Sequence, residues 1–216
     1  MQVLYLHGFA SGPNSLKAKY FAKKLQDVGI NYQILDLNLD DFSKLTPSKA
    51  LNYIKSLIRN EETILIGSSL GGLYSLIIAE QEQMACKLIL LAPALEINFL
   101  WDDIIGADNL KKWKTEGSLP IYHYGYGQTI PLDYSFLADL AKYQDHGFLR
   151  QIPALVFHGI NDVTIPYRVS QRYVDDNAAA IFHQLDSNHS LEDSLAYIWQ
   201  HSANFIGAVS GNQNLI

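Results

Sequence analysis

The 216-residue sequence predicts one α/β domain, in which a parallel β-sheet lies between two layers of helices. Two observations predict this fold class. Short apolar runs alternate along the chain with longer segments of helical periodicity, the order typical of β-α-β units. The runs are also apolar at nearly every position rather than at alternate positions, as expected for parallel strands buried on both faces. We therefore expect a three-layer α/β/α sandwich, and the chain is long enough to bury a sizeable core.

The apolar runs predict six strands, at residues 2–6, 32–37, 63–67, 87–92, 154–159 and 180–185. Helices are predicted at about 14–28, 47–59, 70–83, 167–177 and 190–206. Gly29 is suited to end the first helix, while Thr46 and Pro47 are suited to begin the second as N-cap and first-turn residue. Right-handed crossovers give the strand order second, first, third, fourth, fifth, sixth. Ligand sites in such sheets form at the carboxyl ends of the strands, here between the first and third.

The regular alternation is interrupted once, by an insertion at about residues 95–151 between the fourth and fifth strands. We expect a helical cap within a single domain of residues 1–216. Trp101, Tyr124 and Phe136 are candidates to line a substrate pocket, although aromatic side chains also bury a cap's own apolar face. The tail at 211–216 is expected to fray.

Composition narrows the class of protein. The net charge is −6 and no basic cluster is present, which argues against nucleic acid as a partner. No run approaches about 20 apolar residues, so no membrane span is predicted. The single cysteine, Cys86, cannot form an internal disulfide and the N-terminus lacks a basic signal region, so a cytoplasmic location is expected. No metal-ligand spacing is found, and we expect neither a metal nor an organic cofactor. Nothing in the sequence indicates an oligomeric state.

A glycine-flanked serine stands between the third strand and the next helix. Residues 67–71, Gly-Ser-Ser-Leu-Gly, match G-x-S-x-G in the strand-turn-helix context of a nucleophile elbow. The sharp turn leaves little room for side chains two residues before and after the nucleophile, which selects Ser69 over Ser68. A glycine-rich turn can bind phosphate instead, but the sequence has neither G-x-G-x-x-G nor a Gly-Lys-Ser/Thr ending.

A nucleophilic serine needs a base and a carboxylate that orients the base. Asp162 follows the fifth strand and His189 follows the sixth, so both are expected at the sheet edge where Ser69 emerges. Each of the two also has an ordinary reading as a turn or helix-capping residue. Asp186 and Asp193 are alternatives for the acid.

Two backbone N–H groups are candidates for an oxyanion hole. One belongs to Leu70 at the start of the helix, and the other to Phe9 in the loop after the first strand, with Ala10 as the alternative. His7 and His158 each precede a glycine at a strand end, and we expect them to anchor loops by hydrogen bonds.

The opening LYLHGF.S.P.S.KA, the GSSLGG turn, the HG..D...P segment and a final NH resemble the YqiA-type small bacterial esterases of the α/β-hydrolase superfamily. The resemblance implies an α/β-hydrolase fold with Ser69 as nucleophile, Asp162 as acid and His189 as base. It also implies hydrolysis of carboxylic esters or acyl thioesters. A non-catalytic ligand receptor on the same fold is the alternative, as is a peptidase or carbon–carbon bond hydrolase that uses the same triad.

Overall fold

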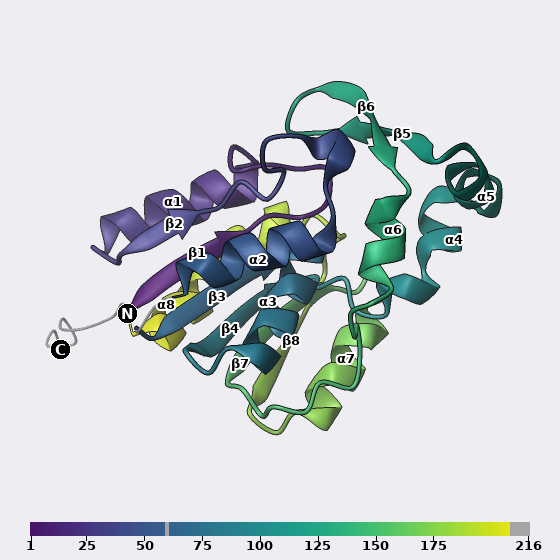
Figure 1. Cartoon of the computed structure of the whole chain (residues 1–216). Helices are drawn as coiled ribbons and strands as arrows, with labels where there is room; N and C mark the ends of the chain where they lie inside the picture. Colours follow the sequence, from purple (N-terminus) through teal and green to yellow (C-terminus); the bar gives the residue numbers. More distant parts are fainter. Residues whose placement is uncertain (59–60, 208–216) are drawn as a thin grey trace, which may run out of the picture.

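The computed structural model describes residues 1–58 and 61–207. Its main sheet has six parallel strands in the order β2-β1-β3-β4-β7-β8, which confirms the predicted order (Figure 1). The strands are β1 (Gln2–Leu6), β2 (Tyr32–Ile34), β3 (Thr63–Ser68), β4 (Ala85–Leu91), β7 (Ala154–Gly159) and β8 (Ala180–Leu185). The edge strand β2 is shorter than predicted: Tyr32–Ile34 pair with Val3–Tyr5 of β1, whereas the N–H of Leu37 donates to the His7 side chain instead of to the β1 backbone.

Helices cover both faces of the sheet, as predicted (Figure 1). One face carries α1 (Leu16–Asp27) and α8 (Leu195–Ile206), and the other carries α2 (Pro47–Leu57), α3 (Leu70–Gln81) and α7 (Tyr167–Asp176). Thr46 caps α2 as expected, since its side chain accepts a hydrogen bond from the Lys49 N–H. Position 59, the predicted end of α2, and the tail at 211–216 lie outside the described residues. Short 3-10 turns occur at Phe42–Lys44, Ile97–Phe99 and Glu192–Ser194.

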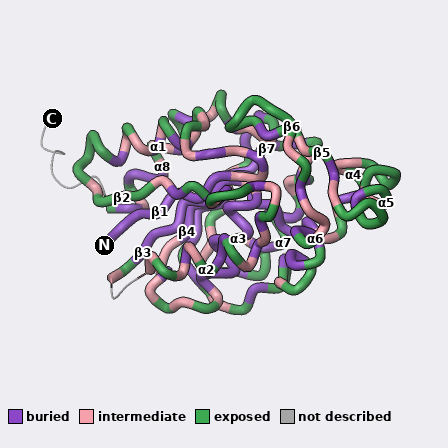
Figure 2. The backbone as a smooth tube through the Cα atoms, turned by 45° about the horizontal axis from the view of Figure 1, so that its top comes forward, coloured by how far each residue is buried: buried purple, intermediate pink, exposed green. Residues whose placement is uncertain are grey.

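The strands are buried because alternate side chains enter two separate apolar layers. In β1, Leu4 and Leu6 join the cluster beneath α2 and α3, whereas Val3 and Tyr5 join the cluster beneath α1 and α8. The backbone trace shows these buried strands at the centre of the molecule (Figure 2).

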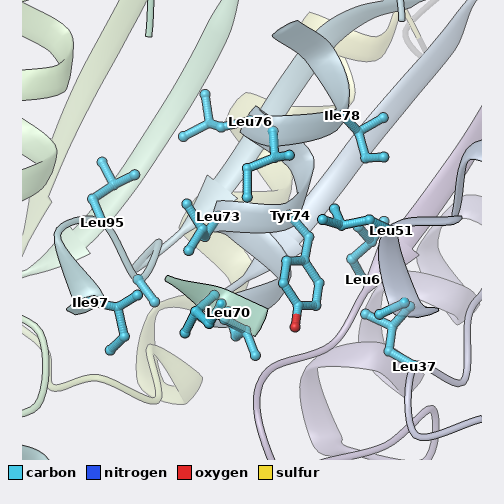
Figure 3. Close-up of a cluster of buried hydrophobic side chains, with 14 of the residues drawn as sticks. Leu6, Leu37, Leu51, Leu70, Leu73, Tyr74, Leu76, Ile78, Leu95 and Ile97 are labelled. Atoms are coloured by element: carbon cyan, nitrogen blue, oxygen red, sulfur yellow. The ribbon is translucent and has the colours of Figure 1, made fainter. Parts of the chain in front are cut away.

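Helix α3 is buried along nearly its whole length, from Leu70 to Ala79. Its Leu73 and Tyr74 lie in the same apolar cluster as Leu6 of β1 and Leu51 of α2 (Figure 3). Each fully buried side chain of this size stabilises the fold by about 1.5–3 kcal/mol. The first turn of α3, directly after Ser69, is therefore fixed against the sheet.

The insertion between β4 and β7 forms a cap at one end of the molecule (Figure 1). It contains α4 (Trp101–Ile105), α5 (Ala107–Glu116) and α6 (Ser135–Leu140), together with an antiparallel hairpin of β5 (Ser118–His123) and β6 (Gln128–Asp133). The prediction of a helical cap did not include this hairpin. Pro120 and Pro131 argue against strands, but the two stand opposite each other in a ribbon where each strand is an edge.

Hydrogen bonds hold the tip of the hairpin against the loop after β1. His123 Nε2 donates to Asn38 Oδ1 at 3.0 Å, and Asn38 Nδ2 donates to the Ser11 carbonyl at 2.7 Å. The Tyr124 N–H donates to the carbonyl of Ala10 at 2.8 Å. The cap is thus attached next to the edge of the sheet where Ser69 emerges.

Candidate active site

Ser69 occupies a strained turn between β3 and α3. Its backbone has φ +52° and ψ −118°, a conformation that residues other than glycine rarely adopt. A Cβ atom at Gly67 would collide with the Gly71 carbonyl and the Ser75 hydroxyl, and one at Gly71 would collide with the Leu6 carbonyl. Both glycines of the motif are therefore required by close backbone approach, as the spacing in the sequence predicted.

The structure brings together the three residues that the sequence placed at separate strand ends. Ser69 Oγ lies 3.0 Å from His189 Nε2, and His189 Nδ1 lies 2.6 Å from Asp162 Oδ2. The Asp162 side chain has no exposed surface, whereas the His189 side chain is 26% exposed. With Nδ1 donating to the carboxylate, Nε2 is left to accept the Ser69 hydroxyl proton.

The carboxylate of Asp162 is surrounded by donors. Its Oδ1 accepts from the N–H groups of Thr164 and Ile165, both at 2.9 Å, and its Oδ2 accepts from His158 Nε2 at 2.9 Å as well as from His189. Burial raises the pKa of Asp162, but the hydrogen bonds from His158 and His189 outweigh it and hold that pKa well below its ordinary value. The carboxylate is therefore ionised at neutral pH.

His158 is fully buried behind Asp162. Its Nε2 also donates to the Ile165 carbonyl at 2.9 Å, while Nδ1 accepts from the hydroxyl of Ser170 at 2.7 Å. The prediction that it anchors a loop is confirmed, but its contact with Asp162 was not predicted. The sequence feature that could have indicated this contact is that His158 lies four residues before Asp162, at the end of the same strand.

His7 also anchors a loop, as predicted. Its Nδ1 donates to the Gly8 carbonyl at 2.8 Å and its Nε2 accepts from the Leu37 N–H at 3.0 Å. This fixes the loop after β1, which passes directly beside Ser69, since a Cβ at Gly8 would lie 3.2 Å from the Ser69 Cβ.

The alternative acids are engaged elsewhere. Asp186 accepts from the Asn161 amide at 2.8 Å, and Asp193 accepts from the hydroxyls of Ser187 and Ser194 at 2.5 and 2.9 Å. Neither aspartate hydrogen-bonds to a histidine in the described part of the chain.

Two loops meet to bring Asp162 and His189 together. Gly159 ends β7, and a Cβ there would collide with the backbone carbonyls of Ser187 and Asn188. The Asn188 side chain accepts from the N–H and the hydroxyl of Ser190, which closes a turn around His189. Helix α8 begins at Leu195, later than the predicted position 190, and this leaves the turn free to form.

The two N–H groups expected in an oxyanion hole lie in the segments that flank Ser69. The Phe9 N–H has no hydrogen-bond partner among residues 1–58 and 61–207. Leu70 is the first residue of α3, so its N–H belongs to the group that lacks an acceptor within the helix.

A cavity of about 1070 Å³ opens beside Ser69 and His189. Five of its lining residues, Phe9, Leu70, Ile97, Trp101 and Ile104, belong to or pack against the apolar cluster beneath α2, α3 and α7, and we call them the apolar side. The polar lining residues, which we call the polar side, include Ser11, Asn14, Ser15, Lys17, Asn188 and Ser190. The polar side is formed by α1, the loop before it, and the loop after β8. Sequence reasoning did not identify Lys17 or the other polar residues of this wall.

The three aromatic residues predicted to line the pocket take different positions. Trp101 lies in the wall and is 7% exposed, while Tyr124 lies at the open edge and is 78% exposed. Phe136 does not line the cavity, because it is completely buried in the cap beside the rings of Phe9, Trp101 and Trp113.

Within the described residues, no group of three or more His, Cys, Asp or Glu side chains could hold a metal ion. The same residues include no helix with the length and apolar character needed to cross a membrane.

A six-stranded parallel sheet that presents a serine elbow, an aspartate and a histidine at its carboxyl edge is the α/β-hydrolase fold. The chain belongs to the Uncharacterised protein family (UPF0227), whose family model matches residues 2–206. This is the YqiA family, so the resemblance noted from the sequence motifs is confirmed. A search of curated proteins gave no match.

Solved structures share the fold at low sequence identity. Alpha/beta hydrolase domain-containing protein 10 from mouse has a TM-score of 0.78 and 19% identity, over 97% of this chain and 90% of that one. Est1E from Butyrivibrio proteoclasticus has a TM-score of 0.73 and 19% identity, over 95% and 88% of the two chains. A monoacylglycerol lipase from Paleococcus ferrophilus has a TM-score of 0.67 and 14% identity, over 93% and 94%.

Proposed function

We propose that the protein is a serine hydrolase that cleaves carboxylic ester or acyl thioester bonds through an acyl-enzyme on Ser69. The observation that carries this proposal is the continuous hydrogen-bond chain from Ser69 Oγ through His189 to Asp162, with links of 3.0 and 2.6 Å. The fold shared with a monoacylglycerol lipase supports an ester as the substrate.

In the first half of the proposed reaction, Ser69 Oγ attacks the carbonyl carbon while His189 Nε2 accepts the hydroxyl proton. The ionised Asp162 stabilises the imidazolium that forms and keeps Nδ1 protonated. The N–H groups of Phe9 and Leu70 donate to the developing oxyanion, and loss of one such donor costs about 3 kcal/mol of barrier.

The tetrahedral intermediate then collapses as His189 gives its proton to the leaving alcohol or thiol. A water molecule repeats the cycle on the acyl-enzyme and frees the acid. Because His189 gives its proton to the leaving group and is adjacent in the chain to Asn188 and Ser190, we assign the leaving group to the polar side of the cavity. We assign the acyl group to the apolar side, which includes Leu70 and Trp101.

A fluorophosphonate probe with intact-mass analysis tests the proposal. The probe is expected to add once to the wild-type protein and to the Ser68→Ala variant, which keeps the neighbouring nucleophile, but not to Ser69→Ala. Stopped-flow hydrolysis of 4-nitrophenyl butyrate is expected to show a burst of nitrophenol in wild type and none in Ser69→Ala. A wild-type protein that neither labels nor turns over the ester would refute the proposal and favour a non-catalytic receptor.

A further inference from the structure

Lys17 is a half-buried cation in the wall of the active-site cavity. It lies in the first turn of α1 and lines the same cavity as Ser69 and His189. Its ammonium group has no hydrogen bond and no ion pair within residues 1–58 and 61–207. On the same helix, by contrast, the exposed Lys23 pairs with Asp27 at 3.2 Å.

The carboxylates around Lys17 do not form an ion pair with its ammonium group. Glu192 and Asp162 both act on it electrostatically, but neither forms an ion pair with it within residues 1–58 and 61–207. The oxygens of Asp162 are already occupied by four donors, and Glu192 is exposed to solvent. Asp103, which also lines the cavity, is exposed on the cap.

Half-burial without an ion-pair partner removes part of the hydration of the Lys17 ammonium group, and this affects its pKa. Burial lowers the pKa of Lys17 to about 8, against the opposing effects of Glu192 and Asp162. An anionic group bound next to the ammonium would remove the penalty, because a buried charge is stable when it is paired. No other lysine or arginine lines the cavity in the described part of the chain.

We propose that Lys17 binds a carboxylate or phosphate group carried by the leaving alcohol or thiol of the substrate. The inference rests on the proposed function, which places the leaving group on the His189 side of the cavity. Lys17 lies on that side, because Glu192 and Asp162, the hydrogen-bond partner of His189, both act on it electrostatically. The acyl side is formed by Leu70, Ile97 and Trp101, which belong to the apolar cluster on the face of the sheet opposite α1. The substrate class is thus an ester or thioester with an apolar acyl group and an anionic leaving group.

Matched esters test the assignment. The substrates are 3-acetoxybenzoate, 3-acetoxyphenyl phosphate and the neutral methyl 3-acetoxybenzoate, and the readout is the ratio of kcat/KM for each anionic ester to that for the neutral one. Lys17→Met is expected to lower this ratio by about 10- to 100-fold, the range for loss of one charged hydrogen bond. Lys17→Arg is expected to retain most of it. The phosphate and carboxylate esters together show which anion is preferred.

The control is Lys19→Met, which removes the same charge from the exposed side of α1 and is expected to leave the ratio unchanged. A second control compares mono-4-nitrophenyl glutarate, which carries its anion on the acyl group, with the neutral 4-nitrophenyl pentanoate. Lys17→Met is expected to have no selective effect on this pair.

Inhibition of the wild-type protein gives a test that does not depend on the folding of Lys17→Met. The wild-type protein is expected to be inhibited by 3-hydroxybenzoate at lower concentration than by the methyl ester of this acid.

An unchanged ratio in Lys17→Met, an equal fall in Lys19→Met, or equal inhibition by the two phenols would overturn the assignment. Failure of the proposed function gives a different result, since wild type would then not hydrolyse the neutral ester, or Ser69→Ala would hydrolyse it equally well.

Discussion

Replacing His158 by leucine is expected to destabilise the protein far more than it impairs hydrolysis. The substitution removes the 2.9 Å hydrogen bond to the buried Asp162 carboxylate and leaves the Ser170 hydroxyl without its histidine partner. Loss of a hydrogen bond to a charged group costs about 1.5–3 kcal/mol, and a buried unpaired polar group adds about 1–3 kcal/mol. We expect the free energy of unfolding to fall by about 3–6 kcal/mol.

The effect on the rate is smaller because three donors remain on Asp162, namely the Thr164 and Ile165 N–H groups and His189. The carboxylate stays ionised and continues to orient His189. We expect kcat/KM for a neutral ester to fall about tenfold, compared with about 10⁴-fold when the triad carboxylate itself is replaced by an amide. His158→Gln, whose amide can donate from a similar position, is expected to recover part of both losses.

Urea unfolding at pH 7 and steady-state hydrolysis of 4-nitrophenyl butyrate measure the two effects. His183→Leu is the control, because His183 lies on the neighbouring strand β8, is part-exposed and has no hydrogen bond to Asp162. We expect this control to change stability by less than about 1 kcal/mol, as for most substitutions away from buried networks. The reasoning is wrong if His158→Leu is as stable as wild type, or if it loses as much activity as Asp162→Asn.

Two further predictions concern the turn and the acid. Gly71→Ala is expected to lower the free energy of unfolding by about 1–3 kcal/mol and to remove most of the activity, because the new Cβ would collide with the Leu6 carbonyl. Gly12→Ala is the control, since its Cβ would meet only Asn38 at 3.8 Å. Equal urea midpoints for the two variants would contradict the argument. The lowered pKa of Asp162 contributes stability that is present above its unfolded value of 3.8 and is lost as the pH falls through the folded value. Wild type is therefore expected to lose stability more steeply than Asp162→Asn below pH ~4 in urea titrations, whereas parallel profiles would show that the carboxylate is not held ionised.

Much of the framework follows from local features of the sequence. The apolar runs predicted β1, β7 and β8 with their observed bounds, because a strand buried on both faces needs an apolar residue at nearly every position. The sharp turn around Ser69 could also be predicted from the sequence, since the collisions that exclude side chains there involve residues close in the chain or on the adjacent strand. The strand order followed from the handedness of the crossovers.

The hairpin of the cap was not predicted, because its strands are stabilised by pairing with each other and by the contact of His123 with Asn38, 85 residues away. The expectation that Phe136 lines the pocket failed for a related reason. Aromatic composition identifies a cap, but which ring faces the cavity depends on contacts between residues far apart in the chain.

The sequence by itself determined the parallel sheet, the elbow and the three side chains that stand at strand ends, since these depend on periodicity and local steric limits. Only the tertiary structure decided that Asp162 rather than Asp186 or Asp193 faces His189, and that His158 supports the same carboxylate. It also decided that Lys17 enters the cavity without a partner. Such pairings depend on distances between residues far apart in the chain, and side-chain hydrogen bonds form only where folding brings the groups within about 3 Å.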